Sequence, residues 1–379
     1  MKQKKNLLPL GFRDVLSKES NLQFEYAKNL LKNFYSWGYS FIEPPIIEFE
    51  STLKEKNNSF LNKKTLSFLD PLTNKRLSLR SDITTQLARI TSDRLFKLPK
   101  PLRLCYLGDV FRADKPKLSS DRQFKQSGIE IIGSKSLYAD IEIIVLSLDS
   151  LKKINFKKIS LDLNISIILE KIFDDLKIPF SKRDNLRKLV ERKNIKEISN
   201  YNKNLYILLK KIIDSTGPLN KNIKKIQKIK FGKNAKKIID KFLKICLLLL
   251  KKDYGNFNIS VDLLDHRGFE YYTGLTFSIF CLDSNKEICR GGRYLTSNND
   301  DAVGSTFFLN QFLQIKINEK KKNKKILIPY SDLFNEKAFE LRRKGWITIQ
   351  NINKDNDKKI AKLHNCKFIL RNKKIIPLK

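Results

Sequence analysis

The sequence predicts an α+β fold in which helices pack beside a largely antiparallel sheet. Segments with strand-like patterns come in runs, and several of them pair as hairpins, whereas the helical patterns are gathered between these runs. The body of the chain lacks the regular alternation of single strands and helices that marks a doubly wound parallel sheet. A chain of 379 residues is also long enough to form two or three domains, each with its own core.

The N-terminal part begins with a helix and continues into short strands. Apolar residues recur at helical spacing over residues 18–38, and Gly38 suits the end of that helix. Residues 39–50 then predict a strand, a break at two prolines and a second strand. Residues 64–80 predict a hairpin, because two alternating segments flank the turn PLTN. The next helix is expected to begin at Ser81 or Asp82, whose side chains can cap its first turn.

The other elements of the body follow from the same patterns. Strands are predicted at residues 103–114, 122–133, 158–165, 258–265, 271–282 and 286–295, and residues 302–315 predict a strand that bends into a helix. Residues 138–154 show an amphipathic helical pattern. Residues 166–253 are helical and rich in lysine, with a break at residues 215–220. This helical region carries few motifs, so the sequence assigns it no role.

Two domains are predicted. Residues 1–318 form the body that contains the sheet, including the helical region at about residues 166–253. The lysine-rich run at residues 318–325 is interpreted as a linker. Residues 319–379 alternate between short strands and helices, which predicts a small α/β C-terminal domain.

A formal net charge of +36 is the most pronounced bulk property of the chain. Clustered lysines and arginines suit nucleic-acid binding, because they release counterions from phosphates. The excess is mostly lysine, however, and it is spread along the chain with abundant asparagine and isoleucine, which is typical of a genome biased toward A and T codons. The compositional explanation is therefore preferred to a nucleic-acid partner, and an acidic protein partner would also suit such a surface.

Other bulk properties argue against several classes of protein. No run of about 18 apolar residues occurs, so no membrane span is expected. Pro9 and Gly11 interrupt the basic N-terminus, which makes it a poor signal peptide. The five cysteines form no C-x-x-C pair and only two histidines are present, which argues against a metal site. We therefore expect buried thiols in a reducing cytoplasm and no cofactor.

Two polar segments interrupt the apolar strands of the body. In LRSDITTQ, Asp82 could hold an ammonium group with help from the Thr84 hydroxyl, although a helix cap explains both residues equally well. In FRADKPKLSSDRQFKQSGIEIIG, Arg112 could bind a carboxylate or phosphate through two hydrogen bonds. Gln126 and Glu130 alternate along the next strand and share one of its faces, which either lines a site or lies open to solvent.

Two later segments combine glycine with arginine or tyrosine. In DHRGFEYYTGLTF, Arg267 precedes Gly268, where the backbone can approach a ligand closely. Tyr271 and Tyr272 offer an aromatic wall with hydroxyl groups, and an amphipathic strand with surface tyrosines is the alternative. In CRGGRYL, two glycines within a strand indicate a bulge or a low floor beneath a ligand.

In this order and at these separations, the four segments resemble the catalytic domain of the histidyl-tRNA synthetases over roughly residues 7–315. LLPLGFRDVL is similar to the opening segment of that family, and LSLRSDITTQLAR stands where the family has L-R-P-E-[GM]-T. The loop FRADKPKLSSDRQFKQ stands at class II motif 2, and AVGSTFFLNQFLQ stands at motif 3. RGFEYYTGLTF and RGGRYL are similar to the histidine-specific segment and to G-G-R-Y-D. The resemblance implies a class II aminoacyl-tRNA synthetase-like antiparallel sheet flanked by helices.

The resemblance also implies a pocket for L-histidine. It assigns Asp82 to the amino group of histidine, and it assigns Glu130 to the imidazole ring. Thr84, Arg112 and Gln126 would hold the backbone of the amino acid. The implied histidine-binding residues are Asp82, Thr84, Arg112, Gln126, Glu130, Arg267, Tyr271, Tyr272 and Tyr294.

The departures from the family pattern fall where a synthetase holds ATP. The motif 2 glutamate is Asp114 here, and the second arginine of the motif 2 loop is Ser120. At motif 3, Gln311 replaces an arginine and Phe308 replaces a glycine, which should block the nucleotide sterically. A lost donor of this kind costs about 3 kcal/mol of transition-state stabilisation. The resemblance thus implies a histidine pocket without a working adenylation site.

A histidine pocket without an ATP site, followed by a tail too short for an anticodon-binding domain, resembles the regulatory subunits of ATP phosphoribosyltransferase. LRSDITTQLARI, RQFKQSGIEIIG and LRRKGWITI are closer to this family than to a synthetase. The resemblance implies a non-catalytic protein that a short-form catalytic subunit needs for activity and for feedback inhibition by L-histidine, in the first step of histidine biosynthesis. It also implies a homodimer, formed through motif 1 within about residues 25–50, inside a hetero-oligomer. A divergent histidine–tRNA ligase and a synthetase-like tRNA-binding protein remain alternatives.

Overall fold

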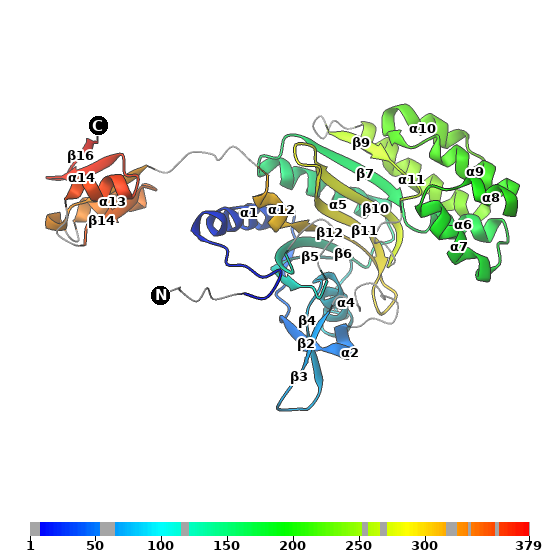
Figure 1. Cartoon of the computed structure of the whole chain (residues 1–379), viewed down its shortest axis with the longest axis horizontal. Coiled ribbons are helices and arrows are strands. Elements are labelled where there is room, and N and C mark those ends of the chain that lie inside the picture. Colours follow the sequence, from blue (N-terminus) through cyan, green and yellow to red (C-terminus); the bar gives the residue numbers. More distant parts are fainter. Residues whose placement is uncertain are drawn as a thin grey trace, which may run out of the picture. The chain divides into compact units, whose positions relative to one another are not determined.

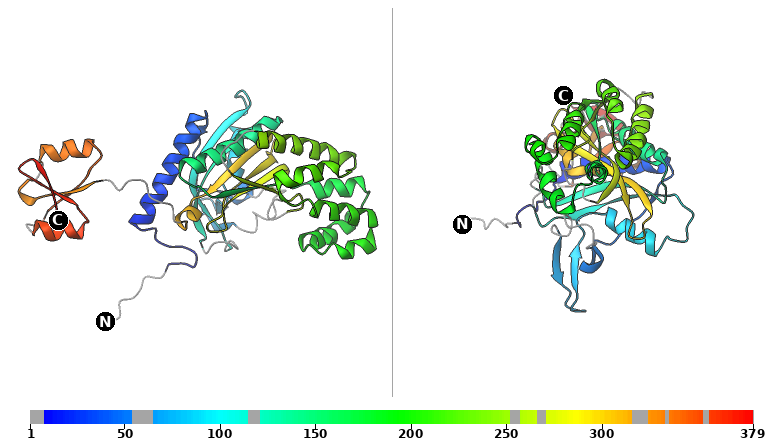
Figure 2. Two further views of the ribbon diagram at one scale, coloured as in Figure 1. Left: turned by 90° about the horizontal axis from the view of Figure 1, so that it is seen from above. Right: turned by 90° about the vertical axis from the view of Figure 1, so that its right-hand side faces the viewer.

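The computed structural model describes residues 8–53, 65–114, 121–251, 257–265, 271–315, 324–332, 335–352 and 356–378. The chain divides into two compact units, Met1–Lys316 and Ile317–Lys379. Helices and strands are labelled in Figure 1, and Figure 2 gives two further views.

A large, mostly antiparallel sheet organises the first unit (Figure 1). Its six central strands pair antiparallel from β5 (Leu102–Phe111) to β7 (Ile159–Ile165), whereas β1 (Ser40–Phe41) joins β5 and β9 (Asn258–Val261) joins β7 in parallel. This arrangement confirms the predicted α+β class. Within the described residues the sheet has nine strands, in the order β1 (Ser40–Phe41), β5 (Leu102–Phe111), β6 (Gln123–Ile132), β12 (Asp301–Phe308), β11 (Lys286–Leu295), β10 (Tyr272–Cys281), β7 (Ile159–Ile165), β9 (Asn258–Val261) and β8 (Gly217–Pro218).

Helices α1 (Ser17–Ser36) and α5 (Leu137–Lys153) pack on one face of this sheet. The Ser147 hydroxyl of α5 lies 2.8 Å from that of Ser305 in β12, and the ring of Phe34 in α1 lies 5.6 Å from the ring of Phe307. Because Ser305 and Phe307 alternate with Gly304, the two helices leave the face that carries Gly304 uncovered. Helix α12 (Leu309–Leu313) continues directly from β12, as the sequence predicted for residues 302–315.

Helix α1 ends as the sequence predicted, because Gly38 adopts a φ of +80°, which favours glycine. The start of α4 (Thr84–Asp93) differs from the prediction. Ile83, rather than Ser81 or Asp82, occupies the capping position, and no side chain caps the helix from there. The Asp82 carboxylate still accepts a hydrogen bond from the Thr84 amide at 2.8 Å, so it lies within reach of the helix without being its N-cap.

A small three-stranded sheet projects from the first unit (Figure 1). The predicted hairpin is confirmed: β3 (Leu66–Leu69) and β4 (Arg76–Leu79) pair antiparallel, and β2 (Ile47–Phe49) pairs with the other edge of β4. The short helix α2 (Glu50–Leu53) follows β2. Of the segments predicted as strands, 258–265 is shorter than expected, because β9 ends at Val261.

Residues 166–251 are helical, as predicted, and Figure 2 shows their helices gathered at one end of the sheet. The helices are α6 (Ile168–Asp175), α7 (Phe180–Glu191), α8 (Lys196–Tyr201), α9 (Lys203–Ile213), α10 (Leu219–Lys228) and α11 (Lys233–Lys251). The apolar run at residues 245–250 lies in α11, where Ile245, Cys246 and Leu249 are buried. None of the helices in the described ranges is long and apolar enough to cross a membrane.

The second unit has its own sheet and core. The alternating pattern of the tail is confirmed, and the last segment folds back as a hairpin of two strands. Its elements are β13 (Lys325–Ile328), a 3₁₀ turn (Tyr330–Asp332), α13 (Glu336–Arg343), β14 (Ile347–Gln350), α14 (Asp357–Leu363), β15 (Phe368–Arg371) and β16 (Lys374–Pro377). All five cysteines of the chain are buried and free, as the sequence led us to expect.

Candidate functional site

The candidate site lies on the face of the large sheet that α1 and α5 leave uncovered. The register of β5, β6 and β12 places Glu130 opposite Leu104 and Gly304 on this face. Gly304 makes room for the carboxyl group, since any side chain at that position would overlap it. Helix α4 packs against part of the same face through Ile83 and Leu87.

Glu130 lies at the centre of a network of hydroxyl groups and is only 1% exposed. The Tyr294 hydroxyl donates to its Oε2 atom at 3.0 Å, and the Thr84 hydroxyl donates to its Oε1 atom at 3.2 Å. The Thr84 hydroxyl also lies 3.4 Å from that of Tyr106, which in turn lies 2.7 Å from the hydroxyl of Thr306. Because these partners come from four different elements, the fold fixes the position of the carboxyl group closely.

Burial raises the pKa of Glu130 to about 8. The hydrogen bonds from Tyr294 and Thr84 lower this pKa, and the charge of Asp82 raises it. Burial also holds the pKa of the Tyr106 and Tyr294 hydroxyls well above their usual range, so both remain donors. At neutral pH the Glu130 group is therefore mostly a carboxylic acid, which can donate one hydrogen bond as well as accept others.

The raised pKa of Glu130 predicts how the free energy of unfolding depends on pH. Between the usual pKa of about 4.5 and the folded pKa of about 8, the folded chain keeps a proton that the unfolded chain releases. The free energy of unfolding should therefore fall as pH rises through this window, by at most about 1.4 kcal/mol per pH unit from this group. Below pH 4.5 both states hold the proton and this loss is absent.

Urea unfolding of the wild type and of Glu130→Gln at pH 5, 6, 7 and 8 checks this. The amide cannot ionise, so the variant should gain stability relative to the wild type as pH rises. If the difference between the two stays constant from pH 5 to pH 8, Glu130 is ionised in the folded state and the prediction is wrong.

Asp82 and Arg112 supply opposite charges beside this network. Asp82 Oδ2 accepts a long hydrogen bond from Gln126 Nε2, at 3.5 Å. Arg112 follows β5 directly, and its guanidinium carbon lies 4.9 Å from the centre of the Phe124 ring. Burial lowers the pKa of Arg112, whereas the charge of Asp82 raises it. A carboxylate and a guanidinium that interact electrostatically suit the ammonium and carboxylate groups of a free amino acid.

Three tyrosines form an aromatic wall. The ring centres of Tyr271 and Tyr272 lie 4.1 Å apart, and that of Tyr271 lies 6.1 Å from Tyr294 with the rings at 72°. Tyr272 and Tyr294 are buried. The alternative of a strand with surface tyrosines is therefore wrong.

The structure brings together all the predicted site residues that it describes. Arg267, with its neighbour Gly268, lies outside the described residues, and so does Ser120 of the loop at residues 115–120. Nothing in the geometry tests the roles of these three residues. Each role that the resemblance assigns remains a prediction.

Several buried polar atoms on this face lack a hydrogen-bond partner within the described part of the chain. They are Arg112 Nε, Gln126 Oε1, Thr276 Oγ1 and Asn164 Oδ1. Thr276 and Asn164 are paired in register, so the polar surface continues across β10 and β7. Because buried polar groups without partners are costly, their concentration on one face indicates a site for a polar ligand. The described residues contain no cluster of His, Cys, Asp or Glu that could hold a metal ion.

Three residues of this face were not found from the sequence. Tyr106 and Thr306 connect to Glu130 through Thr84, and Arg290 forms a bidentate ion pair with Glu287. Tyr106 could have been found, because it alternates with Leu104 and Gly108 in an apolar strand. A tyrosine at such a position indicates a buried hydroxyl that needs a partner.

Of the two glycines of CRGGRYL, only Gly292 lies on the face that carries Glu130, where it is paired with Gly304 and Thr276. Gly291 faces the opposite side of the sheet, where a side chain would overlap the ring of Phe277 and the backbone of β12. Gly292 makes room for the side chains of Thr276 and Tyr272 on the neighbouring strand. The register shift that accompanies them lies opposite, between Tyr272 and Thr276 of β10. Close packing between strands therefore explains Gly291, whereas Gly292 lies on the site face and its predicted role there stays a prediction.

Aromatic and cationic side chains contact one another around Phe308, where the resemblance would place the nucleotide. Arg112 lies over the ring of Phe124, and the ring of Phe308 meets that of Phe124 edge-on at 6.4 Å. Phe308 is paired in register with Gln126, so it lies on the same face as Glu130. Gln311 is buried in α12. Asp114, three residues after the end of β5, is exposed.

Comparison with known proteins relates the chain to two groups. A family model described as histidyl-tRNA synthetase matches residues 11–312. The ATP phosphoribosyltransferase regulatory subunit of Paramagnetospirillum magneticum is 30% identical to this chain over 365 residues, which cover 96% of either protein.

Solved structures agree with this fold. An ATP phosphoribosyltransferase regulatory subunit/histidyl-tRNA synthetase from Bacillus halodurans has a TM-score of 0.82 at 23% identity, over 97% of this chain and 98% of its own. A chain of the ATP phosphoribosyl transferase (HisG:HisZ) complex from Thermotoga maritima has a TM-score of 0.59 at 20% identity, over 76% of this chain and 97% of its own. Because both structures are less than 25% identical to this chain, they show its fold alone. They confirm the predicted class II synthetase-like sheet.

Proposed function

We propose a function that starts from one premise: the chain belongs to the family of ATP phosphoribosyltransferase regulatory subunits. The protein is a non-catalytic subunit that binds L-histidine in the site described above. When histidine occupies this site, it controls the activity of a short-form catalytic partner, which needs this subunit in order to be active. The complex joins ATP and phosphoribosyl pyrophosphate in the first step of histidine biosynthesis.

The buried Glu130 carboxyl group carries the histidine assignment. An imidazole ring presents one N–H donor and one acceptor on different sides, and a carboxyl group can pair with either one, since it accepts when ionised and donates when protonated. The pKa of Glu130, about 8, lies near the usual value of about 6.5 for histidine, so a proton can be shared between them. The neighbouring Asp82 and Arg112 match the ammonium and carboxylate of the same molecule, and Gln126 lies beside Asp82.

The contacts around Phe124 support a site without adenylation chemistry. A nucleotide base that stacked on this ring would have to displace the Arg112 guanidinium and avoid Phe308. Gln311 and Ser120, where a synthetase has arginines, cannot neutralise phosphate charge. The site thus keeps the polar groups around Glu130 that suit histidine, and it lacks the groups with which a synthetase binds ATP.

Isothermal titration calorimetry of the purified chain tests this function. L-Histidine should bind one site per chain, and ATP should give no measurable heat. Histidine-dependent exchange of pyrophosphate into ATP should also be absent. Tight ATP binding accompanied by pyrophosphate exchange would show that the chain is an adenylating enzyme instead.

A divergent histidine–tRNA ligase is the second candidate, because the family model matched over residues 11–312 is that of the histidyl-tRNA synthetases. The net charge of +36 also suits binding to tRNA without catalysis. Charging of tRNA with labelled histidine would establish the ligase. Salt-dependent tRNA binding without histidine binding would establish a tRNA-binding module.

The catalytic partner is proposed from relatives. The Thermotoga maritima structure is that of an ATP phosphoribosyl transferase (HisG:HisZ) complex, which supports a hetero-oligomer for this chain too. Coupling between sites is reciprocal, so nucleotide substrate bound to the partner must change the affinity of this chain for histidine. The free buried cysteines support a reducing, cytoplasmic setting.

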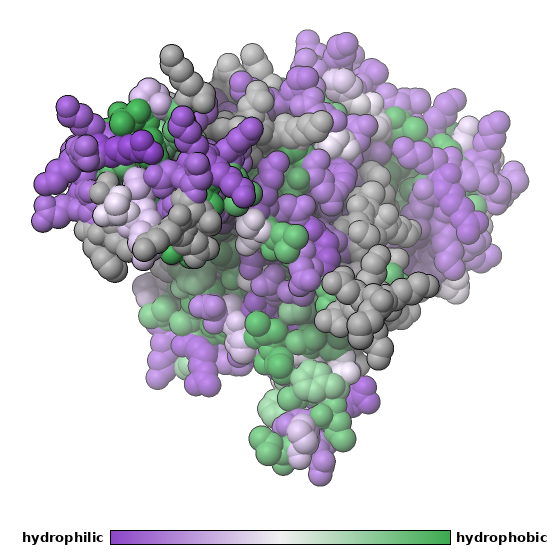
Figure 3. Space-filling model, turned by 60° about the vertical axis from the view of Figure 1, so that its left-hand side comes forward, coloured by the Kyte–Doolittle hydropathy of each residue, from purple (hydrophilic) through white to green (hydrophobic). Residues whose placement is uncertain are grey.

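A homodimer within that complex is proposed from the small three-stranded sheet. Its strand register places six apolar residues on one face, and three of them are more than 40% exposed. Figure 3 shows hydrophobic residues gathered around and over this projecting sheet. A second copy of the chain would cover such a face. The six residues are Ile47, Phe49, Leu66, Phe68, Leu77 and Leu79.

Phe68→Asp should weaken the dimer. A two-fold interface contains each residue twice, so the charge is introduced twice and the dissociation constant should rise at least about a hundred-fold. Size-exclusion chromatography with light scattering measures the mass. Leu363→Asp serves as the matched control, because Leu363 is exposed in the second unit. A dimer that survives Phe68→Asp would remove this face from the interface.

A further inference from the structure

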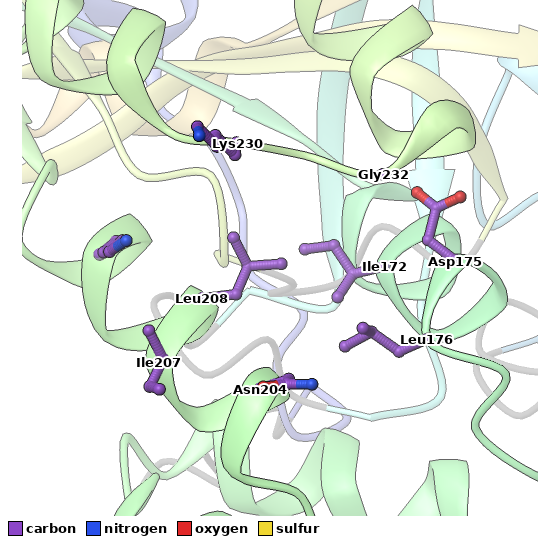
Figure 4. Close-up of a pocket in the computed structure, with 9 residues that line it drawn as sticks. Ile172, Asp175, Leu176, Asn204, Ile207, Leu208, Lys230 and Gly232 are labelled. Carbon is purple, nitrogen blue, oxygen red and sulfur yellow. The ribbon is translucent and has the colours of Figure 1, made fainter.

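A cavity of about 310 Å³ lies within the helical region, between α6, α9 and the turn that leads into α11 (Figure 4). Its aliphatic walls come from Ile172 on α6, from Leu176 directly after that helix, and from Ile207 and Leu208 on α9. In Figure 4 the side chains of Ile172, Leu176 and Leu208 point toward a common centre. The cavity lies away from the sheet face that carries Glu130, so it is separate from the proposed histidine site.

The single acid that lines the cavity is already engaged by the fold. Asp175 Oδ2 accepts from the Ala235 amide, and Asp175 Oδ1 accepts from the amide and side chain of Asn234, each at 2.9 Å. These bonds cap the start of α11. Gly232 lets the turn approach Asp175, because any side chain there would overlap it. The remaining charged groups of the lining are two lysines, Lys211 and Lys230.

Basic charge is concentrated in the part of the helical region that contains α9, α10 and the start of α11. Residues 203–239 contain eleven lysines and one acid, Asp214. All eleven are exposed, and none forms an ion pair with another described residue. Residues 168–201 differ, with nine basic and six acidic residues, several of them paired, as in Arg183–Asp174 and Arg187–Glu170. A uniform compositional drift does not explain this uneven distribution along the chain.

We infer that the cavity, with Lys211 and Lys230 in its lining, docks an acidic protein segment that inserts one apolar side chain between α6 and α9. The aliphatic walls suit an apolar anchor, and the lysines suit carboxylates on either side of it. Nucleic acid fits less well. Residues 203–239 contain no arginine, and the cavity lining has no aromatic ring on which a base could stack. This inference does not depend on the proposed histidine site.

Fluorescence anisotropy with defined peptides tests the inference on the full chain. The probes are fluorescein-labelled heptapeptides of sequence DEDXDED, in which X is Leu, Ile, Phe or Trp, with X as Ala for the control. We expect the best apolar peptide to bind at least about ten-fold more tightly than the Ala peptide, because the anchor buries its side chain. Equal binding of all five peptides, or binding of none, overturns the inference.

Charge-reversal variants locate the peptide. Lys211→Glu combined with Lys230→Glu should weaken binding of the best peptide at least about ten-fold. Lys188→Glu combined with Lys196→Glu is the matched control, since it makes the same change in charge on exposed lysines of α7 and α8 outside the cavity lining. An equal loss in both variants would mean non-specific attraction. A single-stranded RNA 20-mer that binds more tightly than the peptides, and depends on Lys211 and Lys230, would replace the protein partner with nucleic acid.

Discussion

Replacing Glu130 by alanine is expected to abolish binding of L-histidine at micromolar concentrations. Glu130 is the buried group that the imidazole ring would contact, and its loss leaves the hydroxyls of Thr84 and Tyr294 without their acceptor. A polar ligand group left without its buried partner costs about 3 kcal/mol, so the dissociation constant should rise roughly a hundred-fold. Isothermal titration of the purified variant measures this.

Glu142→Ala is the control for that experiment. Glu142 is a partly buried acid on α5 that accepts hydrogen bonds from Arg103 and Tyr39, away from the candidate site. Its replacement should leave histidine affinity within about two-fold of the wild type, as expected for a site without shared contacts. Glu130→Ala should also leave the dimer intact, and in the complex it should remove inhibition by histidine while activity persists. Unchanged inhibition would refute the assignment of Glu130.

Replacing Asp140 by alanine should lower the free energy of unfolding by about 3 kcal/mol, because the buried Arg293 loses its bidentate partner and keeps only Asp301, at 3.6 Å. Arg293 donates to both oxygens of Asp140, from Nε at 2.9 Å and from Nη2 at 2.8 Å. The side chains of both residues are almost fully buried. The same guanidinium donates to the carbonyl oxygens of Ser134 and Ser136. It thereby fastens β11, next to Tyr294, to the start of α5.

Urea unfolding, with Asp283→Ala as the control, measures this effect. Asp283 pairs with Lys158 at 3.0 Å, but both side chains are more than half exposed. Surface pairs of this kind contribute roughly 0–1 kcal/mol, so the control should unfold at nearly the urea concentration of the wild type. Similar losses in the two variants would mean that the Arg293–Asp140 pair contributes no more to the free energy of unfolding than the exposed pair does.

Much of the fold could be predicted from local patterns. Apolar spacing gave the extent of α1 and α5 within about two residues, and alternation around PLTN gave the β3–β4 hairpin. The start of α4 was misplaced, because Asp82 can accept from the Thr84 amide without occupying the capping position. Capping preference describes a local competition among neighbouring residues, so it does not choose between adjacent starting positions of a helix.

Part of the candidate site could also be predicted from local patterns. Gln126 and Glu130 lie on one face because β-strand geometry requires it, and the sequence alone shows this alternation. The same rule could not reveal that Tyr106 and Thr306, which lie 200 residues apart, share a hydrogen bond near Glu130. It also gave the wrong role for Gly291, whose neighbour Phe277 comes from another strand.

The sequence by itself determined which residues are polar within apolar strands, which strand face each one occupies, and which family the chain resembles. These properties follow from residue type and from the fixed periods of helix and strand. Only the tertiary structure decided that Glu130 is buried among hydroxyl groups with a pKa of about 8, and that Arg112 lies over Phe124. Burial and contacts between distant strands set these properties, because desolvation and hydrogen bonding depend on which groups the fold brings together.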